Sequence, residues 1–272
     1  MKSFALALGA GGARGLAHIA VIEALDEMDA RPAAIAGASI GAVIGAGYAA
    51  GLTGRVMRRQ LLKVAHDPGE VLRRVMAARA VAWSQMLGAG FGNPLVVDGL
   101  KFYDAFLGEL LPADFADLKV PLSVVATDLH GREPVIFREG SLRLAVSSSL
   151  AVPGLVQPIS ADGRVLIDGG VTDPLPFSVL RGAADVIVAV DVSGGMVDAA
   201  GVPGPWESLF AAISVMSRTI VSERLKSGAP DLVLRPNIGI FRMLDFLQAS
   251  AILRAAEPIK AEVKEKLEAL LA

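Results

Sequence analysis

Short apolar runs alternate along this chain with stretches that show the apolar spacing of helices. The runs typical of buried strands are residues 4–8, 33–38, 120–127, 134–137, 164–167 and 185–192. Helices are predicted at residues 19–28, 40–50, 142–150, 206–220 and 252–270. Because strands that alternate with helices form parallel sheets covered on both faces, this order predicts a three-layer α/β/α fold with a mostly parallel central sheet and a helical C-terminal part.

The 272 residues are enough for one large domain with a substantial core. We predict a single domain over residues 1–272, with a core at about 4–195 and a helical C-terminal extension at about 206–272. The stretch 194–205 is the least patterned part of the chain. An alternative is therefore a core that ends there, followed by a separate helical cap.

Mean hydropathy is high, at +0.53, so membrane segments were considered. The longest uncharged run, residues 32–54, has the length of a membrane span, but it contains six Gly and few large apolar side chains. We interpret it as a strand, a turn and a buried helix. The N-terminal MKSFALALGAGG resembles a secretion signal, but its apolar part is short and leads directly to a Gly-rich loop and Arg14. A first strand explains it better.

Charge and residue content restrict the function classes. A net charge of −2 argues against a generally basic nucleic-acid binder. The chain has no Cys and three His, which excludes thiolate nucleophiles and Cys-ligated zinc and leaves few metal ligands. The lack of Cys is also typical of a reducing compartment. We therefore expect no metal, no cofactor, no nucleic-acid partner and a cytoplasmic location.

Gly37-Ala38-Ser39-Ile40-Gly41 fits the Gly-x-Ser-x-Gly pattern and lies between a predicted strand and a predicted helix. That context is the one a nucleophile elbow requires, because the turn presents the serine oxygen at a helix N-terminus. The alternative is a glycine turn that only lets a helix pack closely against the sheet. The pattern indicates Ser39 as the candidate nucleophile.

A second Gly-rich loop, Gly9-Ala10-Gly11-Gly12-Ala13-Arg14-Gly15, also lies between a strand and a helix. It does not match the dinucleotide-binding pattern G-x-G-x-x-G, because Arg14 stands where the last Gly is needed. Free N–H groups of Gly11 and Gly12 are suited to an oxyanion hole instead. An ordinary tight turn is the structural alternative.

Asp168 directly follows the predicted strand 164–167 and precedes Gly169 and Gly170. Asp-Gly is also a common turn sequence. However, a Ser-Asp-His hydrolase of the α/β type needs a His after its acid, and the last His of this chain is His130. A serine hydrolase here needs another base, and an ionised Asp close to the hydroxyl is suitable. We therefore expect no essential group with the ordinary His pKa of about 6.5.

These three motifs, in this order, resemble the patatin-like phospholipase family over roughly residues 4–195. The stretches 147–154, with Pro153, and 185–192 agree, and 232–246 agrees more faintly. The resemblance implies a lipid acyl hydrolase, of phospholipase A or lysophospholipase type, with a Ser39–Asp168 dyad and no cofactor. It implies an oxyanion hole from the amides of Gly11, Gly12, Ala13 and Ile40. The motif-supporting residues are then Arg14, Gly15, Gly37, Gly41, Gly169 and Gly170.

Two positions depart from the family pattern. Ala10 stands where the first of three consecutive Gly is usual, and Asp173 stands where Asn is expected. We expect Gly11 and Gly12 to preserve the hole, and the charge of Asp173 to raise the pKa of Asp168. Arg14 either anchors the loop or meets a phosphate. The rival functions are an acyltransferase on the same dyad, a catalytically silent regulatory or scaffold protein, and a dinucleotide-binding oxidoreductase, which the loop pattern disfavours.

Residues 55–79 contain seven Lys or Arg against two acidic residues, interleaved with apolar residues. The functional interpretation is an interfacial lid over residues 55–97, including the uncharged stretch 88–97, that brings the active site to a lipid surface. The alternative is a helical segment in contact with solvent, with its cationic side chains exposed. The expected partners are thus a phospholipid or other acyl ester and, through 55–97, the surface of a membrane.

Overall fold

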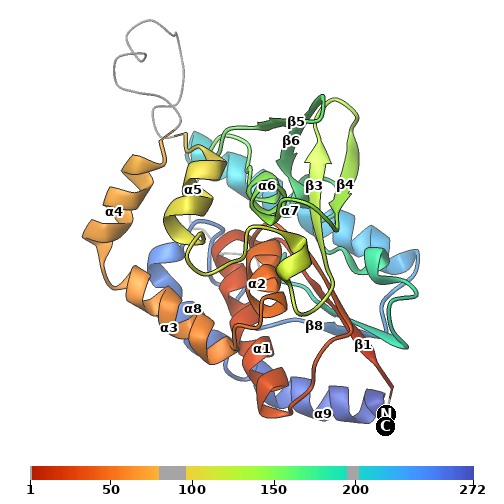
Figure 1. Cartoon of the computed structure of the whole chain (residues 1–272). Helices are drawn as coiled ribbons and strands as arrows, with labels where there is room; N and C mark the ends of the chain where they lie inside the picture. Colours follow the sequence, from red (N-terminus) through yellow and green to blue (C-terminus); the bar gives the residue numbers. More distant parts are fainter. Residues whose placement is uncertain (1, 80–95, 195–201) are drawn as a thin grey trace, which may run out of the picture.

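The structure is a computed structural model that describes residues 2–79, 96–194 and 202–272 (Figure 1). Its strands are β1 (Phe4–Leu8), β2 (Ala34–Ala38), β3 (Leu122–Asp128), β4 (Glu133–Phe137), β5 (Ile159–Ala161), β6 (Arg164–Asp168), β7 (Val186–Val190) and β8 (Leu232–Leu234). Its α-helices are α1 (His18–Glu27), α2 (Ile40–Ala49), α3 (Gly54–Ala65), α4 (Pro68–Ala77), α5 (Gly99–Phe106), α6 (Leu142–Ser149), α7 (Pro205–Lys226), α8 (Ala249–Ala256) and α9 (Ile259–Leu271). Short 3₁₀ turns include η1 (Gly12–Ala17), η4 (Gly169–Val171) and η5 (Phe177–Leu180).

The strands form one sheet in the order β5-β6-β3-β2-β1-β7-β8, with β4 also paired to β3. The central strands β3, β2, β1, β7 and β8 run parallel, whereas β4, β5 and β6 add antiparallel pairs. The predicted strands therefore agree with the observed ones to within about two residues at each end, a usual margin for boundaries. The short strands β5 and β8 were not predicted.

The side chains of β1 show how the layers are separated. Phe4, Leu6 and Leu8 point into the main apolar core, which they share with α1, α2 and α6. Ala5 and Ala7 point to the opposite face and pack against η5 and α7. Figure 1 shows α1 and α2 in front of the sheet and α7 behind it. This alternation confirms the three-layer α/β/α fold, because each face of the sheet is covered by helical structure.

The C-terminal part differs from the expected helical extension. Strand β8 pairs in parallel with β7 and extends the sheet, so the segment after residue 202 is not purely helical. Buried residues of α8 and α9, such as Ile252 and Leu267, belong to the same apolar cluster as β1 and α1. These contacts favour the single domain over a core followed by a separate helical cap. Part of the least patterned stretch, residues 195–201, lies outside the described residues.

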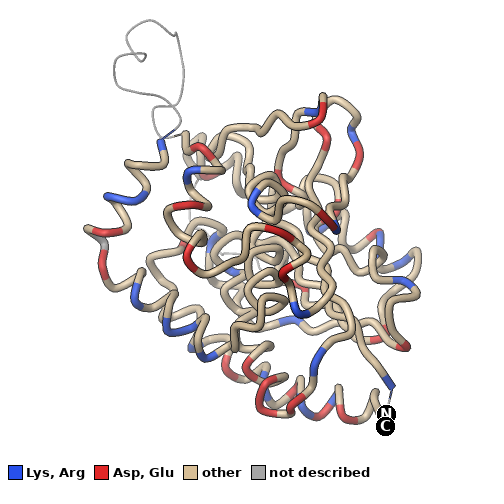
Figure 2. Tube along the Cα trace, in the orientation of Figure 1, with Lys and Arg blue, Asp and Glu red and all other residues tan. Residues whose placement is uncertain are grey.

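The basic segment forms α3 and α4, and Figure 2 shows several Lys and Arg residues along α3. Arg58 is not free for head groups, because its Nε donates to Glu23 at 2.6 Å and its Nη2 to Glu257 at 2.5 Å. Met57 is buried and Leu61 packs against the core, so the apolar side of α3 faces inward. For α3, this favours the interpretation as a solvated helix over that of an interfacial lid. Membrane contact through 55–97 stays a prediction, and residues 80–95 of that segment lie outside the described residues.

Of the helices within residues 2–79, 96–194 and 202–272, none combines the length and the apolar character that a membrane span requires.

Candidate active site

Strands β2 and β6 meet end to end along one edge of β3. Strand β4 pairs with residues 124–128 of β3 and so occupies the opposite edge. On the shared edge, β2 ends with Ala38 opposite Val125, and β6 arrives from the other direction with Asp168 opposite Ala126. Because Ser39 directly follows Ala38, the register alone places the candidate nucleophile and the candidate base side by side.

Ser39 occupies the sharp turn between β2 and α2, with φ 54° and ψ −126°. A positive φ is strained for a residue with a Cβ atom and is typical of functional turns. The turn needs Gly on both sides, because a Cβ at Gly37 would lie 2.5 Å from the Gly41 carbonyl oxygen and one at Gly41 would collide with the carbonyl oxygen of Leu8. The glycines thus allow the close packing that this sharp turn requires.

The two side chains form a direct hydrogen bond. Ser39 Oγ donates to Asp168 Oδ2 at 2.6 Å, and both residues are buried. The other carboxyl oxygen, Oδ1, accepts the amide of Gly170 at 2.7 Å, while Thr127 Oγ1 donates to the Asp168 carbonyl at 2.9 Å. Gly169 lies against the Val125 carbonyl, where a Cβ would collide. The carboxylate is therefore held in one orientation toward the serine.

Burial raises the pKa of the Asp168 carboxyl to about 6, while the hydrogen bonds from Ser39 and Gly170 offset part of the rise. The expected influence of Asp173 is not found. Asp173 forms an ion pair with Arg224 at 3.0 Å. Burial raises the pKa of the Asp173 carboxyl, and the positive charge of Arg224 offsets part of this rise. The elevated pKa of Asp168 therefore comes from its dry surroundings rather than from a neighbouring negative charge.

Sequence reasoning missed the role of Ser149. The backbone amide of Ser39 donates to Ser149 Oγ at 2.8 Å, and this hydroxyl donates onward to the Val125 carbonyl at 2.6 Å. Ser149 ends α6, and it therefore ties the strained turn to the neighbouring strand. The three consecutive serines at 147–149, on a short predicted helix otherwise made mostly of apolar residues, were the available signal.

Three backbone amides are suitable donors, two in the Gly-rich loop and one at the start of α2. Among the described residues, the amides of Gly11, Gly12 and Ile40 donate to no protein acceptor. Two of them lie at the start of η1, and the third begins α2, where helical N–H groups have no partner within the helix. The expectation that Ala13 contributes to the oxyanion hole is wrong, because its amide donates to the Met243 carbonyl at 2.7 Å and is not available to an oxyanion.

Ala10 removes no donor from the site, because its amide donates to the Pro174 carbonyl at 2.8 Å. The methyl group packs above Gly170, where a second Cβ would lie 2.8 Å away. Gly15 serves a similar purpose, because a side chain there would collide with that of Ile40. The departure at position 10 is thus compatible with a complete set of donors.

Two buried side chains hold the carbonyls of the loop. Arg14 Nε donates to the Gly11 carbonyl at 3.4 Å, and its Nη2 donates to Ser214 of α7 at 3.2 Å. Because a trans peptide points its N–H away from its C=O, holding the Gly11 carbonyl also orients the Gly12 amide. Arg14 is 3% exposed, so it anchors the loop rather than reaching a phosphate in solvent.

His18 is the other anchor of the loop. Its Nε2 lies 2.9 Å from the Gly9 carbonyl, and burial lowers its pKa to about 4. The ring is therefore neutral near pH 7 and donates through Nε2, because a carbonyl can only accept. It contacts the loop backbone rather than Ser39, and it holds the Gly9–Ala10 peptide in place.

Within residues 2–79, 96–194 and 202–272, no group of three or more His, Asp or Glu side chains is arranged to hold a metal ion. The chemistry available at the site is that of a hydroxyl, a carboxylate and backbone amides. These groups suit nucleophilic attack on a carbonyl carbon with the negative charge held by N–H donors.

Comparison with known families shows where this chain belongs. A family model described as patatin-like phospholipase matches residues 6–181. The chain belongs to the patatin-like phospholipase family. The matched region includes the Gly-rich loop, the serine turn and the Asp-Gly-Gly segment, so the motifs are found together within one family domain.

Relatives of this patatin-like protein differ widely in length. It is 38% identical over 191 residues to an NTE family protein of Mycobacterium tuberculosis, covering 70% of this chain and 49% of that protein. It is 30% identical over 194 residues to human patatin-like phospholipase domain-containing protein 6, covering 70% of this chain and 13% of that protein. It is 31% identical over 218 residues to lysophospholipase nte1 of Aspergillus oryzae, with coverage of 80% and 13%. The chain thus spans about half the length of the mycobacterial relative and a small part of the others.

Among solved structures, VipD from Legionella pneumophila is similar in fold, with a TM-score of 0.52 and 16% sequence identity. The alignment covers 97% of this chain and 67% of that one. At this identity the similarity concerns the fold alone.

Proposed function

We propose that this protein is a serine lipid acyl hydrolase that cleaves carboxylic esters of the phospholipase A or lysophospholipase type. Family membership and a relative named as a lysophospholipase support hydrolysis of lipid esters. The observation that carries the finer proposal is the 2.6 Å hydrogen bond from Ser39 Oγ to Asp168 Oδ2 on a strained elbow.

The mechanism follows from the groups in place. Asp168 accepts the proton of the Ser39 hydroxyl as Oγ attacks the ester carbonyl carbon. The amides of Gly11, Gly12 and Ile40 stabilise the negative oxygen of the tetrahedral intermediate. Asp168 then gives its proton to the leaving alcohol, which leaves an acyl group on Ser39. Water, deprotonated by Asp168, attacks this acyl-enzyme, and Asp168 returns the proton to Ser39 Oγ as the fatty acid is released.

A fluorophosphonate probe tests the nucleophile directly. We expect covalent labelling, with the modified peptide containing Ser39, and no labelling of the Ser39→Ala variant. Incubation with phospholipid or lysophospholipid, with and without an added alcohol acceptor, then separates hydrolysis from acyl transfer by the products formed. Failure of the folded protein to take up the probe would support the catalytically silent alternative.

The pH dependence of hydrolysis should follow the ionisation of Asp168. Because the base must be ionised and burial raises its pKa to about 6, kcat/KM should be low in acid and rise to a plateau above that pKa. This corrects the expectation from sequence that no essential group titrates near a His pKa. Rate measurements across the acid range locate the inflection.

Replacing His18, His66 and His130 singly shows whether a carboxyl or an imidazole causes the inflection. The inflection should remain in every folded variant, because no imidazole acts as the base. If replacing one of these His residues removes the inflection, Asp168 is not the titrating group.

A further inference from the structure

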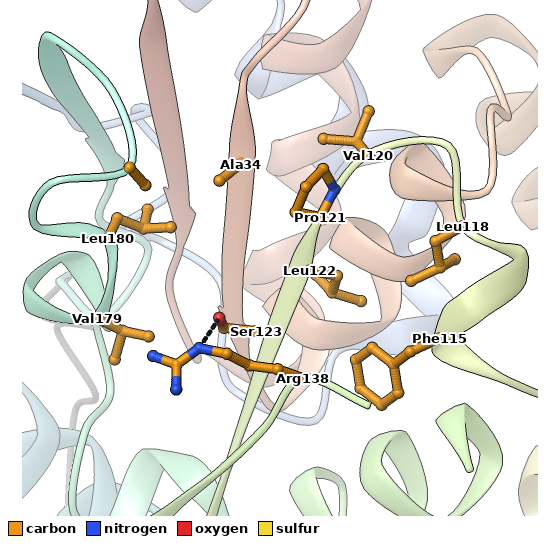
Figure 3. A pocket seen from close by; sticks show the side chains of 11 residues that line it. Ala34, Phe115, Leu118, Val120, Pro121, Leu122, Ser123, Arg138, Val179 and Leu180 are labelled. Carbon is orange, nitrogen blue, oxygen red and sulfur yellow. Dashed lines mark hydrogen bonds between the residues drawn. The ribbon is translucent and has the colours of Figure 1, made fainter. Parts of the chain in front are cut away.

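A concave site lies away from the active site, at the opposite ends of the strands (Figure 3). It is a groove of about 390 Å³ whose floor includes Ala34, the first residue of β2, and Leu122, the first residue of β3. Ser39 follows the other end of β2, five residues along a strand that rises about 3.3 Å per residue. The groove and the nucleophile are therefore separated by roughly 16 Å.

Most of the groove is apolar. Its walls come from the segment before β3 and from η5 and the turn that follows it. The apolar lining residues are Ala34, Phe115, Leu118, Val120, Pro121, Leu122, Val179, Leu180 and Ala183. Figure 3 shows the Phe115 ring on one side of the Arg138 side chain and Val179 on the other.

One charged group, Arg138, lines this groove. Arg138 directly follows β4, and continuing the β3–β4 register places it opposite Ser123. Its Nε donates to Ser123 Oγ at 3.1 Å (Figure 3). Among the described residues, the terminal nitrogens of Arg138 have no hydrogen-bond or ion-pair partner. Arg138 is exposed, and its guanidinium is held by Ser123 with no acidic partner among the described residues.

Ser123 adds a second donor. Its oxygen accepts from Arg138, and no acceptor for its hydroxyl proton lies within the described part of the chain. Ser123 is 7% exposed, so this proton is shielded from bulk water. The free guanidinium nitrogens and the hydroxyl line the same groove, and both are donors of the kind that a carboxylate accepts from.

We propose that this groove binds a long-chain fatty acid, with the carboxylate on Arg138 and Ser123 and the alkyl chain along the apolar walls. Charge complementarity favours an anion, and the uncharged walls favour one with a long apolar tail. Small anions lack the tail, and fatty alcohols lack the charge. The ligand would be a product of the proposed hydrolysis, so its source rests on that function, whereas the binding itself does not.

Binding is tested with oleate, kept below its micelle concentration, by isothermal titration on protein carrying Ser39→Ala. In this background we expect Arg138→Leu to weaken binding at the groove about tenfold or more, since a charge-assisted hydrogen bond is lost. Arg138→Lys should retain part of the affinity. The matched control is Arg254→Leu, which removes an exposed charge from α8 and should leave oleate binding unchanged.

Oleyl alcohol supplies the second comparison. It should bind the parent more weakly than oleate and should be insensitive to Arg138→Leu. Equal oleate affinity in the parent and in folded Arg138→Leu overturns the proposal, as does alcohol binding as tight as that of the acid. If oleate binding depends on Arg138 but the wild-type protein shows no esterase activity, the groove stands and the proposed function is removed, so the two failures are distinguishable.

Discussion

Ser39→Ala and Asp168→Asn should each lower kcat/KM for ester hydrolysis by about 10³- to 10⁶-fold, the range seen when members of a catalytic unit are removed. Without Ser39 no acyl-enzyme forms. Without a carboxylate at position 168 no group accepts the serine proton, because the neighbouring Gly170 amide and Thr127 hydroxyl are donors to Asp168. Initial rates on a lysophospholipid, measured for each variant, give the losses.

The double variant should be hardly worse than either single one, because both changes disable the same step. Ser148→Ala is a suitable control, since Ser148 is buried close to the site but its hydroxyl has no hydrogen-bond partner among the described residues. Wild-type rates in Ser39→Ala, or losses that add in full, would show that the two residues do not act as a unit.

Asp168→Asn should also make the protein more stable near pH 8, by about 1–3 kcal/mol in the free energy of unfolding. The folded pKa of Asp168, about 6, lies above the ordinary Asp value of 3.8. The stabilisation from this group is therefore fully present below the unfolded pKa and is lost as pH rises through the folded pKa. The side-chain amide of the Asp168→Asn variant does not ionise and so avoids that loss. Its gain in stability over the wild type should vanish toward about pH 4. Denaturant titrations at both pH values test this, and an equal or lower stability at pH 8 would contradict it.

Local signals explain why much of the site could be predicted from sequence. The elbow needs only a strand, five residues and a helix in succession, and the loop before it needs the same. The absence of His after residue 130 then left Asp168 as the candidate base. The direct bond between Ser39 and Asp168 agrees with that prediction. Its geometric cause, two strands meeting along β3, is a matter of register that sequence does not display.

The features that sequence reasoning missed all depend on contacts between distant segments. The Ala13 amide is occupied by Met243, 230 positions further along the chain, and the Ser39 amide by Ser149. Strand β8 has only three residues and is defined by its pairing with β7. Such contacts follow from tertiary packing, and short elements of this kind carry little periodicity for a sequence pattern to reveal.

Substitution in the Gly-rich loop should lower the rate of hydrolysis, and Gly12→Ala is the sharpest test of this. Gly12 has φ +59°, and a Cβ there would collide with the Met243 carbonyl oxygen. Relief of that clash must move the loop or residue 243, which breaks the Ala13–Met243 hydrogen bond and turns the Gly12 amide away from the reacting carbonyl. Loss of one such donor should lower kcat by about 10²- to 10³-fold.

Ala10→Gly is the matched control for this loss, because it changes one methyl group in the same loop while the position 10 amide remains bonded to Pro174. It should keep kcat close to the wild-type value. Labelling of Ser39 by a fluorophosphonate should be slowed in Gly12→Ala but not abolished, since the nucleophile and its base are intact. A folded Gly12→Ala protein with unchanged kcat would mean that the loop is only a turn, and that the negative charge is stabilised by the α2 N-terminus at Ile40 alone.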